Sequence, residues 1–344
     1  MLPRERVLAA LEFRSPGFVP VEYHASPAGF MDHGEKLRQL WIEHKDDFGP
    51  VDRFKIPTAD AGGRTWHDAW GVKWHEEAFG AGGIPVARPL ADWQAWADFR
   101  TPALPRTSGP EFDKERVRAA HHREQFFLKS GWISLFELMH ALRPFEDVLM
   151  DIGSGSAEIE RLADRLTEHH LAYLDYVLAR GVDAIQFGDD FGTQSELMMS
   201  PRMWRQFFRP RYEVLVRKSK NAGAKVFFHS CGNVTRLLED IAALSVDAIW
   251  PQLSVYDLRW LARFCRQSRI AIALHPDRGG LMIRSSTDDV RRYVMTLAEI
   301  FDLDQGGGWF YVEIDRGFPF DNVAALTRTI GELRSGMVCS GPVD

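Results

Sequence analysis

Apolar positions along this 344-residue chain follow two periodicities that alternate. Some segments carry an apolar residue every three or four positions, which is typical of helices with one buried face. Others are short, almost wholly apolar and rich in Val, Ile and Phe, which is typical of buried strands. After about Pro144 the two patterns follow one another regularly, separated by short turns that often contain Gly. Such a repeat predicts parallel strands joined by right-handed helical crossovers.

The same patterns give approximate bounds for the elements. Helices are predicted over residues 4–13, 157–179, 201–222, 234–244, 255–266 and 286–303, and strands over 18–23, 131–136, 182–187, 224–229, 246–251, 270–275 and 309–315. These strands come close in number to the eight of a (β/α)8 barrel. A doubly wound sheet would be favoured by a G-x-G-x-x-G turn after the first strand, and the segment Val21-Glu-Tyr-His-Ala25 leads into none. We therefore expect an α/β fold, a single (β/α)8 TIM barrel over residues 1–344, with a Trp-rich elaboration at about residues 31–112.

Charge and composition narrow the class of protein. The formal net charge is -6, and Lys and Arg are spread along the chain without a run, which argues against a nucleic-acid surface. No apolar stretch approaches the ~20 residues of a membrane span, and the charged N-terminus lacks the apolar block of a secretory signal. Three cysteines are too few, and odd in number, for a disulfide framework. We expect a cytoplasmic protein with no nucleic-acid or membrane partner.

Polar side chains follow the C-terminal ends of the predicted strands, where barrel enzymes carry their active sites. They are Glu22, His24, Asp189, Asp190, Gln194, His229, Cys231, Gln252, His275, Asp277, Glu313 and Asp315. Any one of them suits a cap or a turn, but together they are expected to converge on one rim. Four of these residues are expected to bind substrate: Glu22, His24, Gln252 and His275. For either histidine taken alone, an ordinary structural position in the rim or core is the more common role.

His229 and Cys231 are the most distinctive pair of residues in the sequence. Residues two apart on an extended chain point the same way, so an imidazole and a thiolate can reach one ion, and zinc accepts both. A hydrogen-bonded rim histidine beside a small buried cysteine explains the same short motif equally well. Cys265 in a helical segment and Cys339 in the tail are expected to be inert.

Carboxylates accompany this motif after two other strands. Asp189 directly follows a buried strand and is expected to position substrate or handle a proton, with Gln194 supplying an amide from the same loop. Asp190 suits either such a catalytic role or the cap of the next helix. Glu313 is a candidate third metal ligand; the alternative is that Glu313 and Asp315 are rim acids that balance a nearby arginine.

Several segments of the chain resemble the uroporphyrinogen decarboxylase superfamily. They are Gly188–Gln194, Met199–Arg211 and Phe228–Val234, with further similarity at Arg4–Arg14, Val19–Val21, Gly306–Gly308 and Asp321–Leu326. The resemblance spans nearly the whole chain and implies a (β/α)8 barrel, in agreement with the periodicity.

That superfamily contains decarboxylases and cobamide-dependent methyltransferases. The decarboxylases share an N-terminal Met-Arg-Gln-Ala-Gly-Arg-Tyr stretch whose arginines hold the carboxylates of the substrate, whereas this chain has no arginine pair in the corresponding Glu22–Gly29. The methyltransferases carry H-x-C on a strand and use zinc to activate a methyl donor or acceptor, and His229 and Cys231 match that motif. The resemblance therefore implies zinc-dependent transfer of methyl between a small O-, N- or S-methyl compound and a corrinoid, such as cobalamin, on a partner protein.

The third zinc ligand departs from the pattern of that branch. Many members have a cysteine after the last strand, where this chain has Glu313-Ile-Asp-Arg-Gly317. Either Glu313 replaces the thiolate, which gives a harder site suited to an ether or an amine, or the metal has been lost. Two other functions stay open: a cofactor-free decarboxylase of a smaller carboxylated substrate, and a non-catalytic binding barrel.

Overall fold

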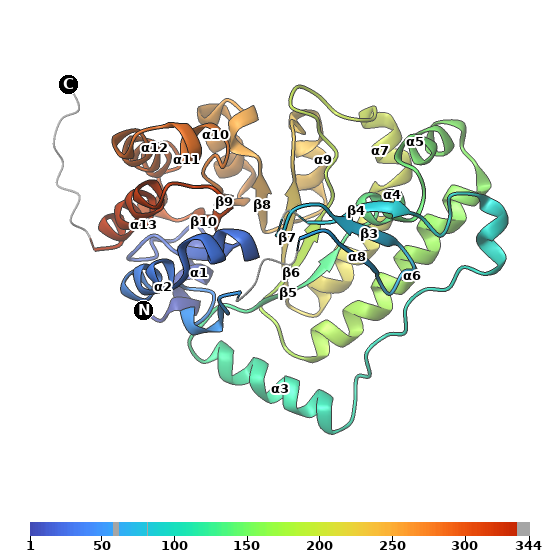
Figure 1. Ribbon diagram of the computed structural model, residues 1–344, viewed down its shortest axis with the longest axis horizontal. Coiled ribbons are helices and arrows are strands. Elements are labelled where there is room, and N and C mark those ends of the chain that lie inside the picture. The colour runs from blue at the N-terminus through green and yellow to red at the C-terminus, as the bar shows by residue number, and fades with distance from the viewer. Residues whose placement is uncertain (58–61, 81, 336–344) are drawn as a thin grey trace. The chain divides into compact units, whose positions relative to one another are not determined.

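The computed structural model describes residues 1–57, 62–80 and 82–335, and its contacts divide the chain into two compact units. The first unit comprises residues 1–60, 122–128 and 247–344, and the second comprises 61–121 and 129–246. Both are built from parallel strands alternating with helices (Figure 1). The chain is therefore a mixed α/β protein with the alternating parallel strands and helices of a (β/α)8 barrel, as predicted. The single domain over residues 1–344 stays a prediction.

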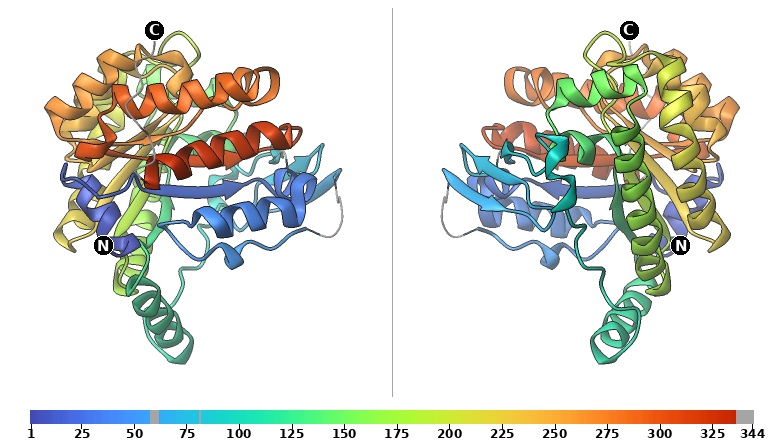
Figure 2. Two further views of the ribbon diagram at one scale, coloured as in Figure 1. Left: turned by 90° about the vertical axis from the view of Figure 1, so that its left-hand side faces the viewer. Right: turned by 90° about the vertical axis from the view of Figure 1, so that its right-hand side faces the viewer.

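The first unit contains four strands in the order β1-β10-β9-β8, and the pairs β1–β10, β10–β9 and β9–β8 are parallel. Their bounds are β1 Val21–Ala25, β8 Ala248–Pro251, β9 Ala271–Leu274 and β10 Gly308–Ile314. The helices are α1 Pro3–Leu11, α2 Pro27–His44, α10 Leu258–Ser268, α11 Gly280–Arg284, α12 Thr287–Ile300 and α13 Phe320–Ser335, with short 3-10 turns η1 Val51–Arg53, η4 Leu253–Val255 and η5 Leu303–Gln305. Strands β9 and β10 are buried almost throughout, as expected of parallel strands covered on both faces. Helices α12 and α13 run side by side (Figure 2).

The second unit contains three parallel strands in the order β7-β6-β5 and a separate antiparallel sheet in the order β2-β3-β4. Their bounds are β2 Arg64–His67, β3 Lys73–Glu76, β4 Ile84–Ala87, β5 Lys129–Ile133, β6 Ala184–Gly188 and β7 Lys225–Ser230. The helices are α3 Pro110–Arg123, most of which lies in this unit, α4 Phe136–Leu142, α5 Phe145–Ser154, α6 Ala157–Ala179, α7 Pro201–Phe207, α8 Arg209–Asn221 and α9 Leu238–Ala243, with 3-10 turns η2 Trp93–Ala97 and η3 Thr235–Leu237.

Most predicted elements are present, and the differences have local causes. The helix predicted over residues 201–222 is two helices, because Pro210 lacks the N–H that would bond to Gln206 and instead stands in the first turn of α8. The strand predicted over residues 131–136 ends at Ile133, since the chain already turns into α4 at Phe136. The first strand begins at Val21, directly after Pro20, and not at Phe18.

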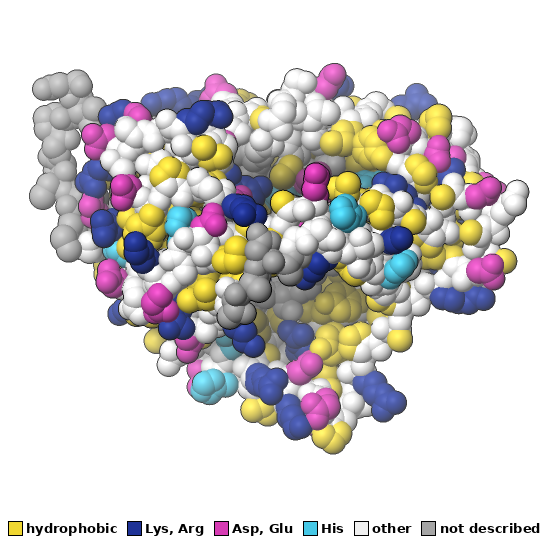
Figure 3. Space-filling view, viewed as in Figure 1, with side chains coloured by type: hydrophobic (Ala, Val, Ile, Leu, Met, Phe, Trp, Pro, Cys, Tyr) yellow, Lys and Arg dark blue, Asp and Glu magenta, His cyan; other side chains and the backbone are white. Residues whose placement is uncertain are grey.

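The Trp-rich elaboration packs through its tryptophans. The Trp93 indole N–H donates to Asp151 of α5 at 3.1 Å, and Trp70 and Trp96 lie against His169 and Arg161 of α6. These contacts anchor irregular backbone to long helices. On the face seen in Figure 3, basic and acidic side chains are interspersed, in keeping with the even spread of charge in the sequence. Within the described residues, no helix has the length and apolarity required to traverse a bilayer.

Candidate functional site

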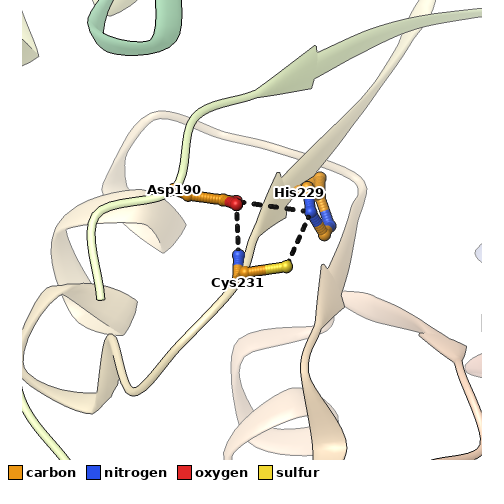
Figure 4. Close-up of side chains that lie close together, drawn as sticks. All are labelled: Asp190, His229 and Cys231. Carbon is orange, nitrogen blue, oxygen red and sulfur yellow. Dashed lines mark hydrogen bonds and ion pairs between the residues drawn. The ribbon is translucent and has the colours of Figure 1, made fainter. Parts of the chain in front are cut away.

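Asp190, His229 and Cys231 come together at the C-terminal ends of β6 and β7 (Figure 4). The parallel register places Gly188 beside His229, so the residues that follow the two strands emerge side by side. The Cys231 amide donates to Asp190 Oδ1 at 2.7 Å. His229 Nε2 lies 3.3 Å from Cys231 Sγ and 3.4 Å from Asp190 Oδ1. The alternation of side chains along β7 thus presents His229 and Cys231 to one point, as predicted.

Hydrogen bonds and charge within this cluster set its protonation. Burial by itself lowers the pKa of His229, but its hydrogen bonds to Asp190 and Cys231 outweigh burial and raise the pKa to about 9. Burial raises the pKa of Asp190, yet the hydrogen bonds from His229 and Cys231 bring it below the usual value. At neutral pH the His229 imidazole therefore carries a proton, and its Nε2 faces both Cys231 Sγ and Asp190 Oδ1.

The donor set of the cluster fits a metal ion. Its nitrogen, sulfur and oxygen atoms all lie within 4.8 Å of one another, and each residue is half-buried. Zinc takes imidazole, thiolate and carboxylate ligands, and a catalytic zinc site uses three protein ligands with a fourth position for water or substrate. Among the described residues, this is the group of His, Cys, Asp and Glu side chains with ligand spacing. The sequence identified two of its members as ligands and the third, Asp190, as catalytic.

The loops that carry Asp190 and Cys231 meet backbone to backbone. A Cβ added at Gly232 would overlap the carbonyl of Gly192, and a Cβ at Gly192 would overlap the backbone at Gly232 and Asn233. Gly232 also has φ +75°, which favours glycine. The Asn233 amide donates to the Thr193 carbonyl at 2.7 Å. This contact fixes the distance between the two loops and hence between the side chains of Asp190 and Cys231.

Asp189, predicted to be catalytic, is completely buried. Its carboxylate accepts five hydrogen bonds, from Ser134 Oγ, the amides of Leu135, Phe136 and Glu137, and the hydroxyl of Tyr212. Burial raises the pKa of Asp189 to about 6, against the opposing effect of these donors. In this arrangement Asp189 fixes the N-terminus of α4. Gln194, predicted to act with it, is exposed in the loop after β6, and the catalytic role of both residues stays a prediction.

Three of the four predicted substrate-binding residues gather around Tyr311 in the first unit. His24 stacks on the Tyr311 ring at 4.8 Å, and its Nε2 lies 2.6 Å from Glu22 Oε1. His275 meets the Tyr311 ring edge-on at 4.9 Å. The Trp250 indole donates to His275 Nδ1 at 3.1 Å and packs on Tyr311 at 4.2 Å. The sequence analysis missed these two aromatic residues, although both lie on apolar strands whose ends carry the predicted polar groups.

Gln252 and Glu313, also in the first unit, make different contacts. The Gln252 amide donates to Ser254 at 3.3 Å, just after β8. Glu313 lies 3.2 Å from Arg278, which also bonds to Asp315 at 2.9 Å. Arg278 is thus an arginine that balances the two rim acids Glu313 and Asp315, which is the alternative that the sequence left open. The assignment of Glu313 as a metal ligand stays a prediction.

The other cysteines differ from Cys231. Cys265 of α10 is buried, and burial raises the pKa of its thiol to about 12, in keeping with an inert role. Cys339 lies outside the described residues.

Solved structures of other proteins resemble this one. A methyltransferase from Methanosarcina mazei aligns with a TM-score of 0.68 at 15% sequence identity, over 96% of this chain and 99% of that chain. An endo-β-1,4-xylanase from Gloeophyllum trabeum has a TM-score of 0.41 at 11% identity, over 66% of this chain and 82% of that one. A dihydropteroate synthase from Anaplasma phagocytophilum has a TM-score of 0.40 at 15% identity, over 61% and 76%.

Sequence comparison gives a family. No curated protein matches the chain. The family model described as uroporphyrinogen decarboxylase matches residues 88–332, which is more than half of the sequence and includes Asp190, His229 and Cys231. With the α/β architecture and the strand-end position of these residues, the match shows that the chain belongs to the uroporphyrinogen decarboxylase family.

Proposed function

We propose that this protein is a methyltransferase that passes a methyl group between a small O-, N- or S-methyl compound and a corrinoid on a partner protein. The observation that carries the proposal is the convergence of Asp190, His229 and Cys231 on one point at the strand ends. The fold-level likeness to the Methanosarcina mazei methyltransferase supports it. The lack of an arginine pair between Glu22 and Gly29 argues against a substrate with many carboxylates.

In this proposal His229, Cys231 and Asp190 hold a zinc ion, and Glu313 stays the further ligand predicted from the sequence. Bound zinc supplies a Lewis acid that stabilises negative charge on the heteroatom that loses or gains methyl. The residues around the centre keep the ligands in place: the Cys231 amide orients the Asp190 carboxylate, and Asp189 and the Gly192–Gly232 contact fix the loops. Such supporting contacts tune a metal site as much as the ligands do.

With an ether donor, the proposed reaction transfers the methyl group without the electron pair of its bond to oxygen. The bond between oxygen and methyl carbon breaks, its electron pair stays on oxygen, and the oxygen takes up a proton. The methyl group bonds to the cobalt of the reduced, cob(I) form of the corrinoid, which supplies both electrons of the new bond. A cob(I) partner requires a reducing compartment, which agrees with the cytoplasmic location expected from the sequence.

The direct test follows the visible spectrum of cob(I)alamin mixed with the zinc-loaded protein and a methyl ether, a methylamine or a methyl thioether. We expect conversion to methylcobalamin with one donor class, lost in Cys231→Ala and kept in Cys265→Ala, whose thiol is buried in α10. No spectral change with any donor class would overturn the proposal. Release of carbon dioxide from a carboxylated compound by chelator-treated protein would establish the decarboxylase instead.

A further inference from the structure

A groove lies in the first unit, apart from the candidate metal centre. Its volume is about 390 Å³, towards the lower end of the range of about 300–1,000 Å³ that is usual for small-molecule sites. It is formed by the first turn of α1, the end of α2, the loop and the 3-10 turn η1 that follow α2, and the segment before β5. Every residue that lines it belongs to the first unit, and none of them is a predicted substrate-binding residue.

The lining of this groove is mainly apolar. Its apolar side chains come from four separate segments of the chain and are Pro3, Ile42, Pro50, Val51 and Phe126. Ile42, near the end of α2, keeps 46% of its surface exposed. Several apolar side chains gathered in one hollow of this volume are typical of a site that binds the apolar part of a ligand.

Two charged side chains of opposite sign also line the groove. Lys45 directly follows α2, and Asp52 lies in η1. Both are exposed. Among the residues that the structure describes, neither the ammonium nor the carboxylate forms an ion pair or a hydrogen bond, with the other or with a third group. Opposite charges that line one cavity without pairing leave room between them for a group that carries both charges.

The backbone at Lys45 points to a role for its side chain. Its φ is +56° and its ψ is 152°, which is outside the left-handed helical region and close to a region that only glycine occupies readily. A lysine in this conformation costs free energy that a glycine would not cost. Strain of this kind is characteristic of positions that hold ligands, and here it falls on the one lysine that lines the groove.

The loop between Lys45 and Asp52 is held rigidly. The buried carboxylate of Asp46 accepts hydrogen bonds from the Tyr23 amide at 3.2 Å, from the Phe48 amide at 2.7 Å and from Arg53 at 2.5 Å. The loop is thereby fixed to the backbone of β1. A wall that is formed before the ligand arrives reduces the entropy lost on binding.

We propose that this groove binds a free apolar α-amino acid. The carboxylate of the ligand pairs with Lys45, and its ammonium group pairs with Asp52. Its side chain lies on the apolar lining around Ile42. An anionic ligand would leave Asp52 unpaired, a cationic ligand would leave Lys45 unpaired, and a small ion would not use the apolar lining. An amino acid with an apolar side chain uses all three features.

The test measures binding to the full chain by ligand-observed NMR, with no metal or corrinoid added. The probes are L-phenylalanine and L-leucine, of which we expect at least one to bind saturably. L-Alanine should bind roughly tenfold or more weakly, because it has little apolar surface to bury. 3-Phenylpropionate lacks the ammonium group of L-phenylalanine and phenethylamine lacks its carboxylate, so both should also bind roughly tenfold or more weakly.

Variants of the two charged residues test the contacts separately. Lys45→Met and Asp52→Asn should each weaken binding roughly tenfold or more. The matched control is Lys36→Met, because Lys36 is an exposed lysine of the same helix that does not line the groove. Lys45→Gly separates loss of the ligand from misfolding: it relieves the backbone strain, so it should unfold at no lower temperature than the native protein while it loses binding.

Three results would overturn the inference. The first is the absence of saturable binding of either amino acid to the native protein. The second is native affinity in both Lys45→Met and Asp52→Asn. The third is binding of 3-phenylpropionate or phenethylamine as tight as that of L-phenylalanine, which would make the groove a site for an apolar anion or cation.

Discussion

The hydroxyl of Tyr212 donates a hydrogen bond to the buried carboxylate of Asp189. Both side chains are excluded from water, and removal of the Tyr212 hydroxyl would leave the Asp189 carboxylate with four of its five donors. A buried hydrogen bond to a charged group is worth roughly 1.5–3 kcal/mol. This pair joins α8 to the end of β6, directly beside Asp190 of the candidate metal centre.

Tyr212→Phe is therefore expected to lower the free energy of unfolding by about 2 kcal/mol in urea titrations at pH 7. The matched control is Tyr23→Phe, because the Tyr23 hydroxyl is buried and makes no hydrogen bond within the described residues. Its removal should change the free energy by less than about 0.5 kcal/mol. Equal losses in the two variants would show that removal of a buried hydroxyl, and not loss of the bond to Asp189, accounts for the effect.

Asp190→Asn is expected to weaken zinc binding by more than tenfold, because a neutral amide is a poor substitute for a carboxylate ligand. His229→Ala and Cys231→Ala should lose zinc altogether when metal content is measured after dialysis against a weak chelator. Zinc retained at the native level in Asp190→Asn would remove Asp190 from the ligand set.

The sequence makes a separate prediction for Glu313. If Glu313 is a zinc ligand, Glu313→Gln lowers zinc affinity while Asp315→Asn, which loses a similar ion pair with Arg278, does not. Equal zinc affinity in these two variants would leave pairing with Arg278 as the role of Glu313. The measurement is competition with a chromogenic chelator.

Thiol reactivity should separate Cys231 from Cys265. In a Cys339→Ala background we expect one thiol to react quickly with a thiolate-specific reagent in the native protein, and zinc to protect it. Cys265 should react only after unfolding, because burial raises its pKa to about 12. Rapid labelling of the Cys231→Ala, Cys339→Ala double variant would contradict the buried position of Cys265.

His170 should make the protein less stable in mild acid. Burial lowers its pKa from 6.5 to about 4, and its Nε2 lies 2.8 Å from the Ser134 carbonyl. Between these two pH values the unfolded chain binds a proton that the folded chain does not, so the stability falls as the pH falls from 6.5 to 4. At ~1.4 kcal/mol per pH unit the full loss is about 3 kcal/mol.

The check compares urea unfolding at pH 7.5 and pH 4.5 in the native protein and in His170→Gln. The loss of stability on acidification should be about 2–3 kcal/mol smaller in the variant. His121→Gln, at an exposed position, should keep the native pH dependence. An unchanged pH dependence in His170→Gln would mean that His170 is protonated in the folded state.

The sequence could predict those features of the fold and of the site that depend on the local pattern of apolar and polar residues. The helix over residues 157–179 has the same bounds in the structure, because its periodicity is long and Ser156 caps it. His229 and Cys231 converge because side-chain alternation is fixed along an extended strand. The sequence predicts a catalytic role for Asp190 and does not group it with His229 and Cys231, because its position beside Cys231 depends on the register of β6 with β7, which local pattern does not contain.

The close approach of Gly192 and Gly232 has a consequence for how the centre assembles. Asp190 and Cys231 are 41 residues apart in the chain, and their loops meet only once β6 and β7 have paired. Asp190 is therefore distant from His229 and Cys231 in the unfolded chain, and an ion bound by all three residues would draw on the folding free energy of the second unit. Zinc should raise the midpoint of thermal unfolding by an amount that grows with the logarithm of the free zinc concentration above the dissociation constant. A chain truncated before Gly232 should bind zinc no better than a peptide containing only the H-x-C motif.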